Sequence, residues 1–160
     1  MTIEVVPVTD AQGVVTNAAL LSAAEAVHRQ LRPQLPPDYV ERMKQIFAGG
    51  AEMAVALIEG RVAGITVYRV LEKTMSGREL HCDDLITDEN LRSGGVGNAL
   101  IAYLQGIVAA RTCDTFTLNS GTQREKAHRF YFREGMTITA FHFSKKVAAK
   151  PAATPGAPTA

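Results

Sequence analysis

The sequence of 160 residues contains no tryptophan, only two cysteines and no long apolar run. No stretch approaches the roughly 20 apolar residues that a membrane-spanning helix needs, so we expect no membrane partner. The first ten residues, MTIEVVPVTD, have neither a basic leader nor an apolar signal segment. We therefore expect a cytoplasmic, reducing location, in which Cys82 and Cys113 are thiols rather than a disulfide.

The sequence also lacks an excess of charge of either sign. Seventeen Lys and Arg residues face sixteen Asp and Glu residues, which gives a net charge of +1. A chain so close to neutrality has no overall field that would steer it onto nucleic acid, and nothing in it resembles a nucleic-acid-binding module. His28, His128 and His142 lack metal-ligand spacing to any cysteine or acid, so we expect no metal.

The length is that of one domain, which can bury a core without disulfides or metals. Towards the end the sequence becomes rich in Ala, Pro and Thr, with almost no large side chain to bury. We expect a single domain over residues 1–147 and a flexible C-terminal tail over residues 148–160.

Strand-like and helix-like patterns alternate along the chain. Clusters of β-branched residues predict strands, and apolar residues at helical spacing predict helices. The expected order is strand 2–8, helix 16–31, helix 37–48, a hairpin over 53–71 that turns at Gly60, strand 78–87, helix 96–111, strand 115–119, helix 122–135 and strand 137–146.

These patterns also predict particular helix ends and a fold class. Thr16 or Asn17 is a candidate cap of the first helix, and Thr122 and Glu125 are spaced as a capping box before a stop at Gly135. The hairpin predicts antiparallel pairing, and the strand-helix-strand unit over residues 80–119 predicts a parallel pair. We expect an α/β (α+β) fold with a mixed, mostly antiparallel sheet and helices on both faces.

A glycine-rich turn, Arg-Ser-Gly-Gly-Val-Gly at residues 92–97, lies between an expected strand and an expected helix. Free amides at a helix N-terminus favour an anion such as phosphate. A nucleoside-triphosphate loop would need Lys and Ser or Thr after Gly97, where Asn98 and Ala99 stand instead. A dinucleotide site would need an acid at the end of the next strand, but Asp114 precedes that strand.

The hexapeptide Arg92, Ser93, Gly94, Gly95, Val96 and Gly97 resembles the pyrophosphate-binding turn of the GNAT superfamily of acyl-CoA-dependent N-acyltransferases. Alone it is weak, because such a turn is often only a tight connection. A second segment, AHRFYFREGM at residues 127–136, is similar to the family's fourth-helix signature, with Tyr131 and Gly135 at the matching positions. It is closest to the branch of aminoalkylphosphonate and other small-amine N-acetyltransferases. The departures from the family pattern are Ser93 for a frequent Gly, Arg124 for a frequent Asn and Met136 for Phe.

This resemblance implies an enzyme that moves an acetyl group from acetyl-CoA to a primary amine of a small molecule by direct attack in a ternary complex. It also implies that the fourth and fifth strands splay and that pantetheine inserts between them. The implied cofactor-binding residues are Leu85, Ile86, Thr87, Arg92, Ser93, Gly94, Gly95, Val96, Gly97 and Asn98.

Three side chains are candidates for proton transfer. Tyr131 matches the family's general acid, and an ordinary phenol, with a pKa of about 10, could protonate a leaving thiolate. Alternatively, Tyr131 is an aromatic residue of the hydrophobic core. His81 and Asp83 resemble the pair of histidines that the serotonin N-acetyltransferase branch uses for proton removal. His81 suits a general base, with Asp83 orienting it or taking the substrate's ammonium; the alternative is a solvated polar strand face.

Strand alternation makes a further prediction about this segment. It places Glu79, His81, Asp83, Leu85 and Thr87 on one face of the strand, and Cys82, Asp84 and Ile86 on the other.

Other functions and the assembly state are left open by the sequence. A protein lysine or N-terminal acetyltransferase would use the same motifs. A catalytically silent acyl-CoA sensor would keep the glycine turn without needing an acid or a base. The acceptor amine is not identified. Similar proteins often form homodimers through an edge strand that follows the fourth helix.

Overall fold

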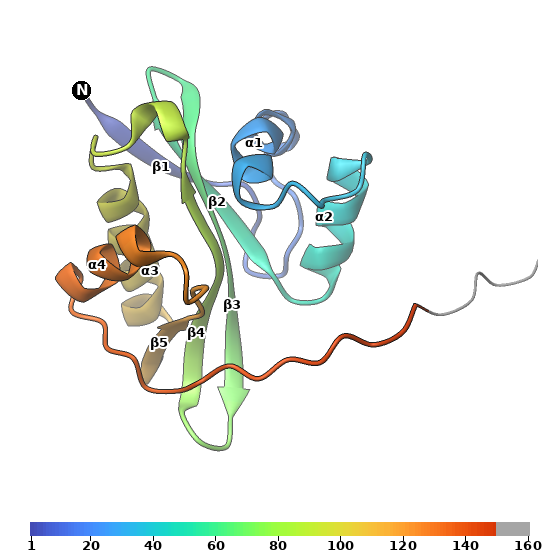
Figure 1. Cartoon of the computed structure of the whole chain (residues 1–160). Coiled ribbons are helices and arrows are strands. Elements are labelled where there is room, and N and C mark those ends of the chain that lie inside the picture. Colours follow the sequence, from blue (N-terminus) through green and yellow to red (C-terminus); the bar gives the residue numbers. More distant parts are fainter. Residues whose placement is uncertain (150–160) are drawn as a thin grey trace, which may run out of the picture.

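Five strands form one sheet in the order β1-β2-β3-β4-β5 in the computed structural model, which describes residues 1–149 (Figure 1). Most of the expected tail, residues 150–160, lies outside the described residues. The elements are β1 (Ile3–Pro7), α1 (Ala18–Leu31), α2 (Tyr39–Ala48), β2 (Glu52–Ile58), β3 (Arg61–Lys73), β4 (Gly77–Thr87), η1 (Glu89–Leu91), α3 (Val96–Ala110), β5 (Thr115–Leu118) and α4 (Glu125–Arg133).

The strand pairing confirms the predicted mixed sheet. β1, β2, β3 and β4 pair antiparallel, whereas β4 and β5 are parallel and are connected through α3. The hairpin between β2 and β3 turns at Glu59 and Gly60, which both have a positive φ (50° and 75°). Such a turn matches the right-handed twist of the strands it joins. β1 lies at one edge of the sheet, as its Pro7 predicted.

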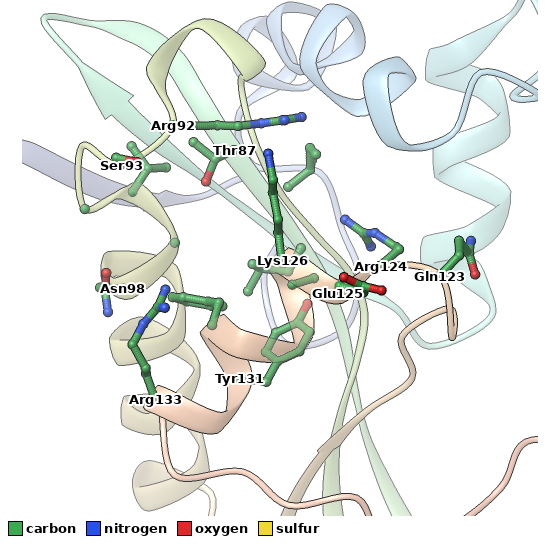
Figure 2. Close-up of a pocket in the computed structure, with 17 residues that line it drawn as sticks. Thr87, Arg92, Ser93, Asn98, Gln123, Arg124, Glu125, Lys126, Tyr131 and Arg133 are labelled. Atoms are coloured by element: carbon green, nitrogen blue, oxygen red, sulfur yellow. The ribbon is translucent and has the colours of Figure 1, made fainter.

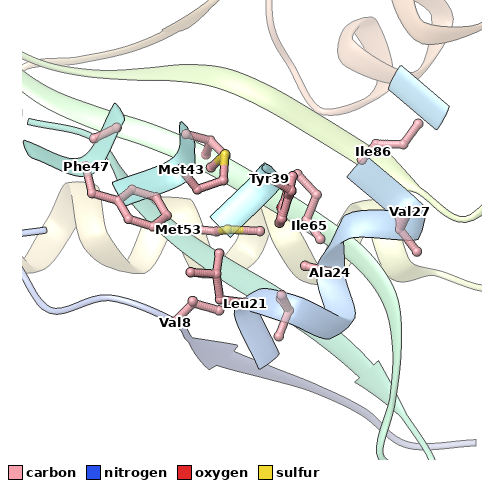
Figure 3. Packing of buried hydrophobic residues seen from close by; sticks show 13 residues of the cluster. Val8, Leu21, Ala24, Val27, Tyr39, Met43, Phe47, Met53, Ile65 and Ile86 are labelled. Atoms are coloured by element: carbon pink, nitrogen blue, oxygen red, sulfur yellow. The ribbon is translucent and has the colours of Figure 1, made fainter. Parts of the chain in front are cut away.

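Helices cover both faces of the sheet. α1 and α2 pack on one face, where Leu21, Met43 and Phe47 are buried against Met53 and Ile65 (Figure 3). Burying each such side chain contributes about 1.5–3 kcal/mol. On the other face α3 buries the apolar stripe that its sequence predicted, including Leu100, Ile101 and Leu104.

α3 can approach the sheet closely because β3 has a glycine beneath it. A Cβ atom at Gly64 would lie 2.6 Å from Cγ1 of Val96 and 2.9 Å from the carbonyl oxygen of Ile86. Real Cβ atoms do not come that close to their neighbours. Gly64 therefore sets the position of the α3 N-terminus beside the end of β4.

None of the helices formed by residues 1–149 is long and apolar enough to cross a membrane.

Two of the expected helix boundaries are correct and one is wrong. Asn17 caps α1 by accepting a hydrogen bond from the amide of Leu20 at 3.0 Å. The predicted capping box of Thr122 and Glu125 does not form, because α4 begins only at Glu125 and has no side-chain cap. A turn in which the amide of Arg124 donates to the carbonyl of Gly121 occupies the preceding residues instead.

The C-terminal end of α4 is built as its Gly135 predicted. Gly135 has a φ of +80° and donates to the carbonyl of Phe132 at 3.1 Å. The amide of Met136 donates to the carbonyl of Tyr131 at 3.0 Å. Together these bonds form a Schellman motif, which ends the helix and fixes the direction in which the chain leaves it.

The predicted last strand, residues 137–146, is absent. These residues have strand-like composition, but they form no strand in the structure and are exposed. A strand is stable only when its backbone groups pair with a neighbouring strand, and no segment among the described residues pairs with this one. It runs instead as an extended chain that crosses the lower part of the view in Figure 1 and then leaves the body of the molecule.

Candidate active site

A cleft opens where β4 and β5 part. The two strands pair only from Glu79 to Cys82 on β4 and from Thr115 to Leu118 on β5, so within residues 1–149 the remainder of β4 up to Thr87 has no partner on that side. The cleft of about 840 Å³ lies between this part of β4, the start of α3 and α4 (Figure 2). It is lined by Leu85, Ile86, Thr87, Arg92, Ser93, Gly95, Val96, Gly97, Asn98, Gln123, Arg124, Glu125, Lys126, Ala127, Phe130, Tyr131 and Arg133.

Most of the residues expected to bind the cofactor are brought together here. All ten except Gly94 line the cleft, and Tyr131 faces them from α4. The proton-transfer candidates His81 and Asp83 do not line it. The sequence did not indicate Gln123, which lies just before α4. The α4 side chains Lys126 and Arg133 were expected mainly on a solvated helix face, with one basic residue reaching the cofactor's phosphates, because which side of the helix meets α3 cannot be read from the sequence.

The N-terminus of α3 presents free amides to the cleft. Gly95 is its N-cap, with a φ of +86°, and no side chain among residues 1–149 caps the first turn. The first intrahelical bond runs from the amide of Ala99 to the carbonyl of Gly95. The amides of Val96, Gly97 and Asn98 thus have no intrahelical acceptor and, with the helix dipole, favour an anion.

The contact between α3 and α4 depends on the last glycine of the turn. A Cβ at Gly97 would lie 3.2 Å from Cζ of Phe130.

Ser93 is the one non-glycine residue of the turn with a left-handed backbone, at φ +68°. It stands where the family frequently has Gly, and there a serine holds a conformation that glycine adopts without strain.

The cleft carries positive charge. Arg92, Arg124, Lys126 and Arg133 line it with a single carboxylate, Glu125. None of the four bases forms an ion pair with an acidic side chain among residues 1–149. Free amides and unpaired basic side chains in one cleft fit a diphosphate group.

Tyr131 projects from α4 into the cleft (Figure 2). Its ring packs against Phe130, with centroids 5.5 Å apart. Burial, and to a lesser extent the nearby Cys82 thiol, raise the pKa of Tyr131 above its ordinary value. The phenol therefore keeps its proton at neutral pH, which is the state that a general acid requires.

A β-bulge changes the facing of β4 next to the cleft. Cys82 is opposite Tyr68 and Asp84 is opposite Val67, so Asp83 is an extra residue without a partner on β3. The predicted alternation of faces is therefore wrong beyond Cys82. Asp84 bonds to α1 and Ile86 packs in the α1–α2 core, whereas Leu85 packs with Cys82 on the α3 side.

His81 and Asp83 do lie near each other, as predicted. Nε2 of His81 is 3.9 Å from Oδ1 of Asp83. The Asp83 carboxylate accepts a hydrogen bond from Nε of Arg69 at 2.6 Å. Because Asp83 is already paired with Arg69, it is a poorer partner for a substrate ammonium than the sequence suggested.

On its other side the ring of His81 contacts a half-buried hydroxyl. Nδ1 of His81 lies 2.8 Å from Oγ1 of Thr117 on β5, and that hydroxyl donates to Oε1 of Glu79 at 2.7 Å. Glu79 is only 5% exposed in its side chain. Burial alone would raise the pKa of Glu79, but hydrogen bonds from Lys73, Ser76 and Thr117 outweigh it and lower the pKa to about 2.

These bonds determine the tautomer of neutral His81. An ionised Glu79 can only accept, so the single hydroxyl proton of Thr117 is used towards Glu79. The Thr117 oxygen must then accept from Nδ1–H of His81, which leaves Nε2 unprotonated. The sequence did not indicate Thr117, because Thr117 lies next to His81 only through the parallel register of β4 and β5.

A second buried polar cluster ties α1 to β4. Nε2 of His28 lies 2.8 Å from Oδ2 of Asp84, and Nδ1 lies 3.0 Å from the hydroxyl of Tyr39. Arg32 pairs with the other oxygen of Asp84. Burial would raise the pKa of Asp84, but the bonds from His28 and Arg32 keep that pKa below its ordinary value.

Residues 1–149 contain no group of three or more His, Cys, Asp or Glu side chains placed to hold a metal ion.

Comparison with known proteins identifies the family to which the chain belongs. A model of the acetyltransferase (GNAT) family matches residues 19–136 of the chain. The protein is thus an acyltransferase that uses acetyl-CoA as its acyl donor. The chain belongs to the GNAT family of N-acetyltransferases.

Relatives agree with this assignment. The uncharacterized N-acetyltransferase YhdJ of Bacillus subtilis (strain 168) is 29% identical over 128 residues, which cover 74% of this chain and 85% of YhdJ. An acetyltransferase of Trypanosoma brucei has a similar structure, with a TM-score of 0.71 at 21% identity, covering 91% of this chain and 100% of its own. Aminoglycoside N-acetyltransferase AAC(6')-Iy in complex with CoA gives a TM-score of 0.78 at 14% identity, covering 92% and 96%. At these identities the structures show a common fold.

Proposed function

We propose that this enzyme acetylates a primary amine of a small molecule, with acetyl-CoA and amine bound together and the amine attacking the thioester directly. One observation carries the proposal: a single cleft holds a helix N-terminus with free amides, an unpaired stretch of β4 and the phenol of Tyr131. An acetyl thioester held by the first two would lie beside the third.

The diphosphate of the donor would bind at the α3 N-terminus. There the amides from Val96 to Asn98 are free, and Arg92 and Arg124 supply charge. Beyond Cys82, no described segment pairs with β4 on its β5 side. The amide groups of the pantetheine arm could pair with that backbone as a strand would. A β4 amide near Leu85 would then stabilise the oxyanion, a contribution of about 10²–10³ in rate.

The attack converts a thioester and an amine into an amide and a thiol. The amine nitrogen bonds to the carbonyl carbon, the C–S bond breaks, and the sulfur leaves with the bonding electrons. Tyr131 gives its proton to that sulfur, because its raised pKa keeps it protonated until the thiolate forms. The nitrogen loses a proton as the amide forms, and that proton returns through water to the phenolate of Tyr131, so that amide and thiol leave with the acid restored.

The amine must lose a proton before it attacks. His81 is the base in this proposal, because its Nε2 is unprotonated while Nδ1–H is held by Thr117. Since His81 does not line the cleft, it acts through a water molecule rather than on the amine itself.

Three features support a small acceptor. Residues 127–136 resemble the branch of small-amine acetyltransferases, and AAC(6')-Iy, whose fold this chain shares, is an aminoglycoside acetyltransferase. The loop between α1 and α2, which should border the acceptor site, is also held in place by hydrogen bonds. Arg29 donates to the carbonyl oxygens of Leu35 at 2.6 Å and Pro36 at 2.7 Å.

A thiol-release assay over an amine panel tests the proposal. Purified enzyme is supplied with acetyl-CoA and, in turn, an aminoglycoside, a polyamine, an aminophosphonate and a lysine peptide. We expect kcat/KM for at least one small amine to exceed that for the peptide by more than tenfold. Preference for the peptide would instead favour a protein acetyltransferase. Binding of acetyl-CoA without turnover of any amine would favour a sensor.

A further inference from the structure

Two arginines meet at Asp83, where the pairing of β4 with β5 stops. Arg69 on β3 donates from Nε to a carboxylate oxygen of Asp83 at 2.6 Å. Arg32, the C-cap of α1, donates from Nη2 to the carbonyl oxygen of the same residue at 3.4 Å. Nη1 of Arg69 also donates to the carbonyl of Gly49 at the end of α2. Both arginines therefore lie on the α1–α2 side of the sheet, opposite α3.

Hydrogen bonds hold the two guanidinium groups in fixed orientations. Nε of Arg32 donates to Oδ1 of Asp84 at 2.7 Å, and the other oxygen of Asp84 is bound by the buried His28. Arg69 is held through two of its nitrogen atoms, by a carboxylate on one side and a backbone carbonyl on the other. Groups that are already ordered lose less entropy when a ligand binds.

Each arginine keeps one terminal nitrogen atom that has no acceptor among residues 1–149. These atoms are Nη1 of Arg32 and Nη2 of Arg69. The two side chains are 41% and 29% exposed, so a small molecule can reach the guanidinium groups. A guanidinium has donors only: it binds carboxylate or phosphonate oxygens in charge-assisted hydrogen bonds and has no acceptor for an amine. The free nitrogen atoms therefore favour an anion.

His81, the base of the proposed function, lies beside these arginines. Its register partner on β3 is Arg69, and paired side chains of an antiparallel sheet lie about 4.5–5.5 Å apart at Cβ. Nε2 of His81 is 3.9 Å from Oδ1 of Asp83, the residue that both arginines contact. An amine held near His81 thus has the rest of its molecule within reach of the guanidinium groups when a short spacer joins its two ends.

We propose that the acceptor is a small amine that also carries an acidic group, and that Arg32 and Arg69 bind this acid while the amine lies near His81. This inference rests on the proposed function and narrows its substrate class. A second amino group would find no comparable partner, because both guanidinium groups are positive and Asp83 is already paired with Arg69. Polyamines and aminoglycosides are therefore expected to be poor acceptors.

A matched series of acceptors tests this charge preference. The full chain and acetyl-CoA are supplied with β-alanine, 2-aminoethylphosphonate, β-alaninamide or 1,3-diaminopropane, and with the shorter and longer members of each series. The second group of these amines differs in charge but not in position. We expect kcat/KM for one of the acids to exceed that for the matching amide and diamine at least tenfold. The better acid shows whether the anion is a carboxylate or a phosphonate.

The other outcomes separate this inference from the proposed function. An amide, diamine or aminoglycoside that is acetylated as well as the acids would overturn the inference and leave the proposed function intact. A chain that acetylates no small amine at all would contradict the proposed function itself.

Single variants test the two arginines. Arg32→Gln and Arg69→Gln each remove a positive charge, and we expect each to lower the ratio of kcat/KM for the acid to kcat/KM for its amide about tenfold. The ratio is measured within one variant, so a loss of folded enzyme cancels. Arg78→Gln is the matched control, because Arg78 pairs with the exposed Glu72 near the start of β4 and should keep the wild-type ratio. Wild-type ratios in both Arg32→Gln and Arg69→Gln would contradict the assignment.

Discussion

Oγ1 of Thr117 lies 2.8 Å from Nδ1 of His81. The two residues are partners in the parallel register of β4 and β5, at the last stretch where these strands pair before the cleft opens. Because the hydroxyl of Thr117 donates its only proton to the buried Glu79, it can only accept a hydrogen bond from His81. One threonine thereby fixes which nitrogen of His81 is able to take a proton.

Thr117→Val removes this acceptor while nearly preserving volume. We expect kcat to fall about tenfold, less than the roughly 10²–10⁴ that general-base catalysis supplies, because the imidazole remains but loses its orientation. KM for acetyl-CoA should not change. Thr117→Ser keeps the hydroxyl and should stay within about twofold of wild type. Steady-state kinetics from pH 5.5 to 9 measures both. Equal kcat values for the two variants would remove Thr117, and with it the orientation of His81, from the mechanism.

Tyr131→Phe removes the proposed acid. The expected result is a fall in kcat of about 10²–10⁴, since proton transfer by a positioned acid contributes that much to the rate. KM for acetyl-CoA should change by less than about twofold, because the hydroxyl acts on the transition state rather than on binding. Tyr103→Phe, which deletes a phenol hydroxyl on α3 outside the cleft, should leave kcat unchanged. If the two variants have similar kcat values, Tyr131 is only a packing residue.

Gly97→Ala tests the glycine turn. The added methyl would meet Phe130 at 3.2 Å and would lie at the entrance of the α3 N-terminus. We expect KM for acetyl-CoA to rise roughly tenfold, with a smaller effect on kcat. Gly106→Ala on the same helix is the matched control. Its Cβ would meet nothing within 4 Å, so it should leave KM unaltered and stabilise α3 by up to about 1 kcal/mol. A KM equal in both variants would argue against donor binding at this turn.

Acid should destabilise the fold in part through Glu79. Its folded-state pKa of about 2 lies below the ordinary value of 4.5, so its contribution is complete above pH 4.5 and is lost as the pH falls towards 2. Urea unfolding at intervals between pH 7 and pH 3 should show the free energy of unfolding decreasing below pH 4.5. Glu79→Gln should flatten that decrease. Glu72→Gln, at an exposed carboxylate, should not. A Glu79→Gln variant with the wild-type slope would show that Glu79 is not held ionised by its neighbours.

Much of the architecture could be predicted from local patterns. The hairpin at Gly60, the parallel β4–β5 pair and the apolar stripe of α3 each follow from periodicity and turn residues close together in the sequence. The position of the glycine turn between β4 and α3 was predictable for the same reason, but its role in the cleft needed the resemblance to a family. The placement of Tyr131 in that cleft needed the resemblance to a family, since helical spacing alone also fits a core residue.

What the sequence could not reveal depends on pairing between distant residues. The bulge at Asp83 is set by β3 and reverses the facing of Leu85, which strand alternation cannot detect. The bonds of His81 to Thr117 and of Asp84 to His28 join residues 36 and 56 positions apart. The missing strand over residues 137–146 is a failure of the same kind, because its composition was right but no partner lies within the described chain.

The most direct test is a crystal structure with bound CoA. We expect the diphosphate within hydrogen-bonding distance of the amides of Val96 and Gly97, and the sulfur within reach of the hydroxyl of Tyr131. We also expect the pantetheine arm along β4 at Leu85. A diphosphate bound away from the start of α3, or a Tyr131 hydroxyl directed away from the sulfur, would contradict the proposed donor site and the role of Tyr131 as the acid.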